Sequence, residues 1–299
     1  MSQKLIGHSD FRYNMKIAIT GATGYIGRFV LEALQNIGEH EIVAAVHTTP
    51  CVMKFNPNTT IVQFDLNEDS SDVYHRLGEP DLLVHLAWGE LSNFMSTSHI
   101  EKELPRQFTF LKNMAVSGVK NIFVSGTCFE YGMLSGCLHE DMCCEPVIAY
   151  GLAKDLLRKQ LNDLKKEYEF QLTWARIFYI DGEPPGRSTL LSSIKRSVAS
   201  GEEFFNMSKG DQLRDFITIE RAAALIVNMA LKMLDIGVVN LCSGNPVSVK
   251  HLVEQRIKEM NWNIKLNLGY YPYPDYEPMN FWGDVSKLNE IIDFEKISK

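Results

Sequence analysis

The sequence predicts a doubly wound α/β fold, in which a parallel sheet is covered by helices on both faces. Short apolar runs alternate along the chain with longer segments of helical periodicity, which is the pattern of such a sheet. The first run is followed directly by the glycine-rich turn TGATGYIG at residues 20–27, and an amphipathic segment follows the turn. With 299 residues, 45% of them hydrophobic, the chain can bury the core that this fold needs.

The first part of the chain supplies the expected sheet and its covering helices. Strands are expected at residues 17–20, 41–47, 60–65, 82–86, 121–125 and 172–177. Helices are expected at residues 25–37, 100–117 and 150–168. Residues 1–14 are polar and aperiodic, so we expect them to form a loose N-terminal tail, and the sheet domain is expected at residues 15–181.

Beyond Asp181 the alternation becomes irregular. Helices are expected at residues 188–200, 220–234 and 249–261, and a short strand at residues 238–242. Such a segment usually forms a smaller lobe over the carboxyl edge of the sheet, where open α/β sheets bind their ligands. We therefore expect residues 182–299 to be mostly a smaller substrate-binding lobe.

Three glycines in the first turn have separate physical roles. Gly21 permits a tight turn, Gly24 lets the backbone approach a pyrophosphate, and Gly27 lets the helix pack closely on the strand. The phosphates would then lie at the positive N-terminus of the helix. The turn predicts dinucleotide binding, with an ordinary glycine-rich turn as the alternative.

Composition and charge narrow the possible partners. Thirty Lys and Arg against 37 Asp and Glu give a net charge of −7, which argues against nucleic acid or an anionic membrane as the main partner. No apolar run approaches the roughly 20 residues of a membrane span, and no secretory signal is recognisable, so we expect a cytoplasmic protein. Six cysteines form no CxxC pair and are expected to be reduced, and no His, Cys and Asp spacing indicates a metal centre.

A tyrosine and a lysine one helical turn apart form the second chemical pattern. Residues four apart lie on one face of a helix, so the Lys154 ammonium can lower the pKa of the Tyr150 phenol from about 10 toward neutrality. A tyrosine tuned in this way can act as an acid or a base. Two surface neighbours are the alternative, but the preceding strand ends in hydroxyls at Ser125 and Thr127.

Further motifs accompany this pair. They are the sequence SGTCFEYG at residues 125–132, the pair Asp65 and Leu66, DLLVHLA at residues 81–87 and RDFI at residues 214–217. Together with TGATGYIG, these motifs resemble the extended short-chain dehydrogenase/reductase family acting on nucleotide sugars, over about residues 15–284. The resemblance implies a Rossmann dinucleotide-binding domain that holds the catalytic residues.

The same resemblance implies roles for individual residues. Thr127, Tyr150 and Lys154 would be catalytic, with Thr127 bonded to the substrate oxygen. Cofactor contacts would come from Gly21, Thr23, Gly24, Tyr25, Ile26, Gly27, Arg28, His47, Asp65, Leu66, Leu86 and Ala87, as well as Tyr150 and Lys154. Substrate contacts would come from Trp88, Cys128, Glu130 and Arg214, with Arg214 on the diphosphate of the sugar nucleotide.

Two departures from the family pattern refine the expected reaction. Members that dehydrate sugars carry an acidic pair directly after the catalytic Ser or Thr, whereas this chain has Cys128 and Phe129, with Glu130 displaced by one residue. Dehydration is therefore disfavoured. At the end of the second strand, His47 stands where NAD-specific members place an acid on the ribose, so a 2′-phosphate would not be repelled and Arg28 or His47 could contact it. This favours NADPH over NADH.

Three functions remain open at this stage. The first is NAD(P)H-dependent reduction of the C4 keto group of a nucleotide-linked 4-keto-6-deoxyhexose, in deoxysugar biosynthesis for surface polysaccharide. The second is a 4-epimerase with tightly held NAD, and the third is a dinucleotide-binding regulator without turnover, which usually lacks the catalytic Tyr or Lys. The resemblance also implies a homodimer through residues 100–117 and 150–168, while the nucleotide base, the sugar and the product stereochemistry stay open.

Overall fold

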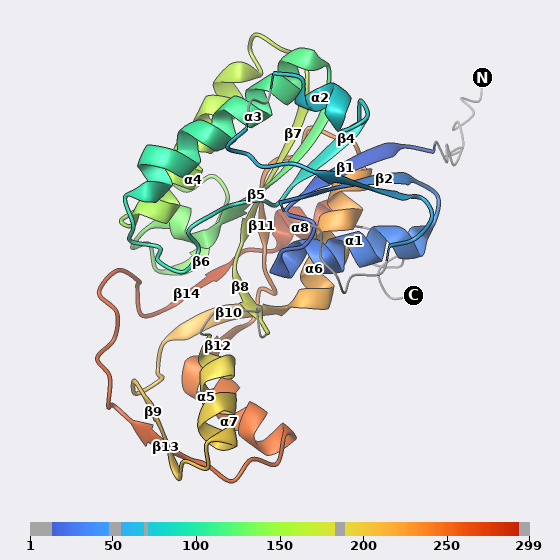
Figure 1. Ribbon diagram of the computed structural model, residues 1–299. Coiled ribbons are helices and arrows are strands. Elements are labelled where there is room, and N and C mark those ends of the chain that lie inside the picture. Colours follow the sequence, from blue (N-terminus) through green and yellow to red (C-terminus); the bar gives the residue numbers. More distant parts are fainter. Residues whose placement is uncertain (1–13, 48–54, 69–70, 183–188, 293–299) are drawn as a thin grey trace, which may run out of the picture.

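A seven-stranded parallel sheet forms the centre of the molecule (Figure 1). The computed structural model of the chain describes residues 14–47, 55–68, 71–182 and 189–292. The strands of this sheet are β1 (Lys16–Thr20), β2 (Glu41–Val46), β3 (Thr59–Gln63), β4 (Leu82–His85), β5 (Asn121–Thr127), β7 (Gln171–Ile177) and β11 (Gly237–Leu241). Their order is β11-β7-β5-β4-β1-β2-β3, so the direction of winding reverses between β1 and β4. The expected doubly wound α/β fold is confirmed.

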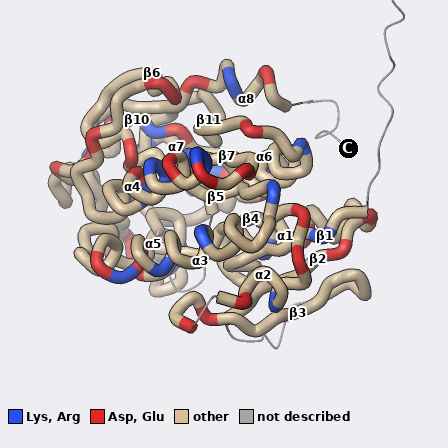
Figure 2. The backbone as a smooth tube through the Cα atoms, turned by 90° about the horizontal axis from the view of Figure 1, so that it is seen from above, with Lys and Arg blue, Asp and Glu red and all other residues tan. Residues whose placement is uncertain are grey.

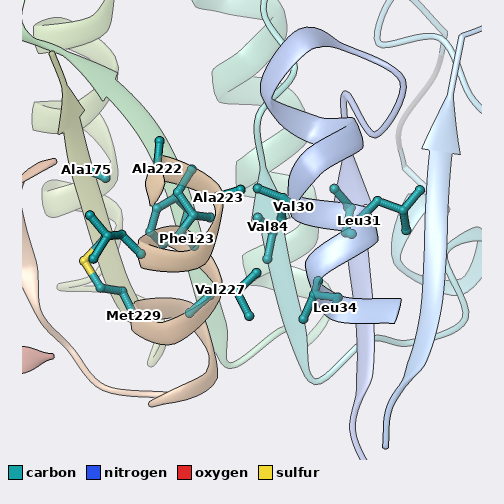
Figure 3. Close-up of a cluster of buried hydrophobic side chains, with 14 of the residues drawn as sticks. Val30, Leu31, Leu34, Val84, Phe123, Ala175, Ala222, Ala223, Val227 and Met229 are labelled. Atoms are coloured by element: carbon teal, nitrogen blue, oxygen red, sulfur yellow. The ribbon is translucent and has the colours of Figure 1, made fainter. Parts of the chain in front are cut away.

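The central strands of the sheet are apolar on both faces because they are buried on both faces, whereas the edge strand β3 is largely exposed. Ile17 and Ile19 of β1 face one hydrophobic cluster, while Ala18 faces another. The first cluster lies between the sheet and two helices, α1 (Tyr25–Ile37) and α6 (Ile219–Leu231), as Figure 3 shows. The second lies beneath α3 (Leu104–Ser117) and α4 (Ala149–Leu164), with the short α2 (Val73–Arg76) beside them. This layering explains why the sheet strands read as continuous apolar runs.

Several boundaries differ from the sequence-based expectation. The segment expected as one helix at residues 100–117 begins with a π-helical turn, η1 (His99–Glu103), and α3 then starts with Pro105 in its first turn, where a missing N–H is tolerated. The helix expected to reach residue 168 ends at Leu164. The start of the helix expected at residue 188 lies outside the described residues, as do Thr48, Thr49, Cys51 and residues 1–13.

The C-terminal part adds three smaller sheets (Figure 1). One contains β8 (Tyr179–Asp181), β10 (Leu213–Thr218) and β12 (Pro246–Ser248), the second pairs β9 (Phe204–Met207) with β13 (Lys265–Leu268), and the third pairs β6 (Gly136–Leu138) with β14 (Phe281–Gly283). Helices α5 (Leu190–Ala199), α7 (Val249–Glu259) and α8 (Ser286–Ile291) complete this part. The sequence pattern did not predict these strands, because all of them except the six-residue β10 have only three or four residues, too few to establish a period.

The two parts of the chain are interleaved. Although it follows Asp181, α6 packs beside α1, and β11 joins the main sheet next to β7. A division at Asp181 therefore remains a proposal.

Acidic and basic residues are interspersed over the surface, as along α7 in Figure 2. In the described residues, no helix is both long and apolar enough to cross a membrane.

Candidate active site

A cavity of about 1180 Å³ lies along the carboxyl ends of β1, β4 and β5, where the winding of the sheet reverses. The glycine turn, the loop after β4, the start of α4 and parts of the C-terminal lobe all contribute to its wall. Most of the expected site residues line it: Gly21, Thr23, Gly24, Tyr25, Ile26, Gly27, His47, Asp65, Leu66, Leu86, Ala87, Trp88, Thr127, Cys128, Tyr150, Lys154 and Arg214. Segments far apart in the sequence thus meet at one place.

The glycine turn brings backbone close to the cavity floor. Gly21 has a positive φ of 69°, and a Cβ atom there would lie 2.8 Å from the Ala87 nitrogen. A Cβ atom at Gly27 would collide with the Gly21 carbonyl oxygen. Gly24 precedes helix α1 and offers no side-chain cap, and the first turn of the helix lines the cavity.

Strand β5 presents its two hydroxyls to the cavity. Side chains alternate along a strand, so Ser125 and Thr127 share one face, while Gly126 faces Trp174 on the other. The next four residues form the short helix η2 (Cys128–Tyr131), which Thr127 caps: its Oγ1 accepts a hydrogen bond from the Phe129 nitrogen at 3.3 Å. The cap fixes the direction of the Thr127 hydroxyl.

Tyr150 and Lys154 enter the cavity from the first turns of α4. The Lys154 ammonium donates to the Ser125 carbonyl at 2.7 Å, and it lies 3.9 Å from the centre of the Trp88 ring and 5.9 Å from that of Tyr150. Burial lowers the pKa of Lys154 to about 7, although the negative charge of Glu130 opposes the shift. The lysine is therefore held beside the tyrosine by a backbone bond and an aromatic face.

Four rings surround the Tyr150 side chain. Their centres lie 5.1 Å (Phe94), 5.2 Å (His99), 5.9 Å (Trp88) and 6.4 Å (Phe129) from the centre of the Tyr150 ring. The Tyr150 backbone nitrogen also donates to the Phe94 carbonyl at 3.1 Å, which ties the loop after β4 to the start of α4. The phenol thus lies in a largely aromatic part of the cavity.

The two histidines near the centre are neutral members of hydrogen-bond networks. His99 accepts from the Trp88 indole at 3.1 Å and donates to the Asn93 carbonyl at 3.0 Å, and burial lowers its pKa. His85 is bonded to Thr20 and Gln107, and burial lowers its pKa to about 3. Both shifts favour the neutral imidazole, so neither histidine is suited to exchange a proton at neutral pH.

His47 and Asp65, both expected at the cofactor site, lie next to each other in the cavity wall. His47 Nε2 lies 3.1 Å from the Asp65 carboxylate, which also accepts hydrogen bonds from Asn67. The bond from the Asn67 backbone nitrogen is the main reason that the pKa of Asp65 lies below its ordinary value. The expectation that a 2′-phosphate would not be repelled at His47 is not supported, because the pairing of β2 with β3 brings the Asp65 carboxylate next to His47.

Arg214 lies on the opposite wall of the cavity and is already bonded. It is 3% exposed, and its guanidinium contacts the Glu277 carboxylate at 2.8 Å and the Leu213 and Met279 carbonyls at 2.8 and 2.9 Å. Glu277 and Met279 belong to the segment between β13 and β14, which the sequence did not connect with Arg214. The side chain faces the cavity together with its counter-ion.

Two expected contacts need correction, since neither residue belongs to the cavity wall in the described structure. Glu130 is fully buried on the far side of η2, where it accepts bonds from the Thr127 nitrogen, Trp174 and Arg176 at 2.9 to 3.0 Å. Its place in the capping box of η2 directs it inward. The Arg28 guanidinium packs 5.0 Å from the centre of the Phe29 ring, outside the cavity wall.

Comparison with known proteins gives a consistent result. The chain matches the NAD dependent epimerase/dehydratase family over residues 17–242. It is 32% identical over 271 residues to the dTDP-6-deoxy-L-talose 4-dehydrogenase (NAD(+)) of Aggregatibacter actinomycetemcomitans, covering 90% of this chain and 99% of that protein. The chain belongs to the NAD dependent epimerase/dehydratase family.

Two further similarities span most of the chain. The GDP-6-deoxy-D-talose 4-dehydrogenase of the same organism is 24% identical over 288 residues, covering 93% of this chain and 91% of that protein. The structure of UDP-N-acetylglucosamine 4-epimerase from Methanobrevibacter ruminantium M1, in complex with UDP-N-acetylmuramic acid, superimposes with a TM-score of 0.80 at 19% identity, covering 94% of this chain and 92% of that one. As a member of the epimerase/dehydratase family, the chain is an NAD-dependent nucleotide-sugar oxidoreductase.

Membership of the epimerase/dehydratase family agrees with the glycine turn, which fits a dinucleotide. The missing Cβ atoms at Gly21 and Gly27 let the turn pack against Ala87 and the helix pack against the turn, and the N-terminal turn of α1 lines the cavity where a pyrophosphate could bind. Phe94, Tyr179 and Glu277 are among the cavity residues that the sequence-based argument missed. Phe94, an aromatic residue in a polar loop, was the one visible signal.

Proposed function

We propose that the protein reduces the C4 keto group of a nucleotide-linked 4-keto-6-deoxyhexose, or oxidises the corresponding alcohol in the reverse direction. Two relatives named as 4-dehydrogenases of 6-deoxytalose nucleotides support this reaction, since a 4-dehydrogenase and a 4-ketoreductase catalyse opposite directions of one equilibrium. Deoxysugar biosynthesis for surface polysaccharide would use such a step.

The observation that carries this proposal is the set of rings around Tyr150. A sugar whose C4 oxygen contacts the Tyr150 hydroxyl has its C6 substituent on the neighbouring ring carbon, so C6 must lie close to Phe94 or Phe129. An aromatic wall suits the methyl group of a 6-deoxyhexose better than a hydroxymethyl or carboxylate group, because a polar group would lose water there without gaining a partner. The wall therefore supports a 6-deoxy substrate.

The inward direction of Glu130 opposes dehydration. Elimination of water needs an acid and a base beyond the tyrosine, and the residues directly after Thr127 are Cys128 and Phe129. Glu130 is bound to Arg176 and Trp174 behind the cavity wall, so it cannot supply the missing proton transfer. Burial also raises the pKa of the Cys128 thiol, which keeps that group protonated.

The three central side chains have complementary roles in the proposed reaction. Tyr150 protonates the oxygen that develops negative charge at C4, and the Lys154 ammonium makes the phenol a stronger acid. The Thr127 hydroxyl, held by its cap on η2, orients the same oxygen. Hydrogen bonds that stabilise the negative charge on the C4 oxygen in the transition state lower the activation barrier, whereas equal stabilisation of the bound substrate would not.

The cofactor would lie across the carboxyl ends of β1, β4 and β5. Gly24 and the start of α1 would hold its pyrophosphate, Asp65 and Leu66 its adenosine, and Ala87 and Lys154 its nicotinamide end. When bound, a nicotinamide dinucleotide supplies the hydride. The sequence-based preference for NADPH has no support in the structure, and the charged Asp65 beside His47 disfavours a 2′-phosphate, so we propose NAD(H).

We also propose a homodimer through α3 and α4. The two helices lie side by side on one face of the sheet, and their outer sides are exposed at Val116 and Lys159. Pairing with a second copy would form a bundle of four helices. Sedimentation velocity at micromolar concentration checks this point, and a monomer would contradict it.

The reaction can be tested with the 4-keto products of dTDP-, CDP-, GDP- and UDP-sugar dehydratases. Each is supplied with NADH or NADPH while absorbance at the nicotinamide band is followed. We expect consumption of NADH with at least one nucleotide and faster turnover with NADH than with NADPH. Interconversion of two 4-epimeric sugars without added cofactor would indicate the epimerase, and binding of cofactor without either reaction would indicate the regulator.

A further inference from the structure

Cys137, His139 and Asp284 meet on the small sheet formed by β6 and β14. One donor atom of each residue lies within 4.8 Å of the others, and in the described structure none of the three belongs to the wall of the active-site cavity. We propose that these side chains form a binding site for a thiophilic divalent cation of the Zn²⁺ type, separate from the nucleotide-sugar site. Sequence spacing does not reveal this group, because 147 residues separate Cys137 from Asp284.

The backbone aligns the three side chains before any cation binds. Alternation along an extended strand puts Cys137 and His139 on one face, while Leu138 between them is 1% exposed and packs in the core. The parallel pairing places Gly283 opposite Leu138, and the Asp284 nitrogen donates to the Leu138 carbonyl at 2.9 Å. Asp284 therefore stands next to the Cys137 and His139 side chains by virtue of strand register.

The donor atoms are close to the separations that tetrahedral zinc requires. Cys137 Sγ lies 3.9 Å from one Asp284 oxygen, and His139 Nδ1 lies 3.8 Å from the other. Zn–S bonds of about 2.3 Å and Zn–N or Zn–O bonds of about 2.0–2.2 Å, set at tetrahedral angles, place ligand atoms roughly 3.4–3.6 Å apart. The three donors lie within 4.8 Å of one another, so they would move closer when a cation binds, and water would complete the coordination.

Neighbouring groups hold the donors in place. The Ser286 nitrogen donates to Asp284 at 2.9 Å, and the Trp282 side chain is hydrogen-bonded to Cys137. Bonds of this kind orient metal ligands and strengthen binding. The donor set of thiolate, imidazole and carboxylate selects Zn²⁺ or a similar ion over Mg²⁺ or Ca²⁺, which take oxygen ligands. Binding replaces the Cys137 thiol proton, which passes to solvent.

A cation at this site would connect two segments that serve the active site. β6 follows η2, whose cap directs Thr127, and the segment leading to β14 supplies Glu277, the partner of Arg214. Joining β6 to Asp284 would link these two segments directly. We expect the bound cation to raise the midpoint of thermal unfolding in proportion to the logarithm of its concentration above its dissociation constant.

Co²⁺ is the probe for this site, because thiolate ligation to Co²⁺ gives a sulfur-to-metal charge-transfer band in the near ultraviolet. The full-length reduced protein is titrated with Co²⁺ and then with Zn²⁺, and equilibrium dialysis gives the stoichiometry. We expect one cation per chain, a charge-transfer band, and loss of that band when Zn²⁺ displaces Co²⁺. Absence of the band in the wild-type protein would overturn the proposal.

Three variants locate the binding. Cys137→Ser should abolish the charge-transfer band. His139→Gln replaces an exposed ligand side chain and should weaken Zn²⁺ binding at least about a hundredfold, because mutating residues that merely hydrogen-bond to metal ligands already costs about 10–100-fold in affinity. Cys143→Ser removes an exposed thiol outside the group and should bind like the wild type. Far-ultraviolet circular dichroism without metal checks that each variant is folded. A band that persists in Cys137→Ser, or disappears in Cys143→Ser, would contradict the proposal.

Discussion

The two long walls of the active-site cavity are built differently. The sheet wall consists of the glycine turn, the end of β5 and the start of α4, and its geometry follows from local backbone features such as the positive φ of Gly21 and the cap at Thr127. The lobe wall depends on contacts between segments far apart in the chain, such as the bond between Arg214 and Glu277, which are 63 residues apart.

The walls also differ in their charges. On the sheet wall, the Lys154 ammonium is buried against the Ser125 carbonyl and the Trp88 ring, so its positive charge acts on the neighbouring phenol. On the lobe wall, the Arg214 charge is neutralised by Glu277. We propose that the side chains of the sheet wall carry out the chemistry, and that Arg214 on the lobe wall exchanges Glu277 for the substrate diphosphate.

Replacing the phenol of the sheet wall should have the largest effect. We expect Tyr150→Phe to lower kcat at least about a hundredfold, because general acid catalysis contributes about 10²–10⁴-fold. Cofactor affinity should change little, since the ring remains. Initial rates at saturating substrate and a direct titration of NADH give the two values.

Tyr168→Phe is the matched control, because Tyr168 packs beyond the C-terminal end of α4 in the second hydrophobic cluster. It should keep the wild-type kcat. A kcat of Tyr150→Phe within a few-fold of the wild-type value would contradict the role of Tyr150 as general acid.

Removing the arginine of the lobe wall should affect binding more than chemistry. We expect Arg214→Gln to raise KM for the nucleotide sugar at least about tenfold, because a charge-assisted hydrogen bond contributes about 1.5–3 kcal/mol. Its kcat should stay within a few-fold. Arg256→Gln breaks a similar pair with Asp181 in the same lobe and serves as the control. An unchanged KM in Arg214→Gln would show that the diphosphate binds elsewhere.

Substrate choice depends on the aromatic residues at the boundary of the two walls. We expect the wild type to favour a 6-deoxyhexose over its 6-hydroxy analogue by roughly 10- to 100-fold in kcat/KM, which is the range for one hydroxyl in an apolar pocket. Phe94→Asn should reduce this ratio, because the amide can bond to the hydroxyl. Competition between the two sugars measures the ratio, and an equal preference in the wild type would contradict the ring argument.

The smallest effect is on stability and follows from the lysine. The pKa of Lys154 is lowered by burial to about 7, whereas an unfolded lysine has a pKa of about 10.4. Between these values the unfolded chain binds the extra proton, so the contribution of Lys154 to stability rises with pH by up to about 1.4 kcal/mol per pH unit. This stabilising contribution is fully present above the pKa that Lys154 has in the unfolded chain, and it is lost as the pH falls toward 7.

Thermal unfolding of the wild type and of Lys154→Met between pH 6.5 and 9 tests this contribution. The midpoint of the wild type should rise relative to that of the variant by roughly 2–4 °C per kcal/mol. A difference that stays constant, or falls as the pH rises, would show that Lys154 remains charged when buried.

The same contrast explains what could be predicted from the sequence. The main sheet and helix α1 follow from local periodicity, and the pairing of Tyr150 with Lys154 follows from their spacing on a helix, whereas the addition of Thr127 to this pair was implied by the family resemblance. The partner of Arg214 and the inward direction of Glu130 depend on how distant segments pack, and a single sequence contains no record of such contacts. Asp65 was identified, but its closeness to His47 followed from the pairing of β2 with β3.

The central claim is that hydride passes between the cofactor and C4 of a nucleotide-linked 6-deoxyhexose, so that the sugar undergoes net reduction or oxidation. The most direct test supplies dTDP-4-keto-6-deoxyhexose with NADH deuterated at the transferred position and locates the label in the product by NMR. We predict deuterium at C4 of the released sugar, in equal amount to the NADH consumed. Change of configuration at C4 without NADH consumption, and with no label from added cofactor, would contradict the claim and assign the protein to the epimerases.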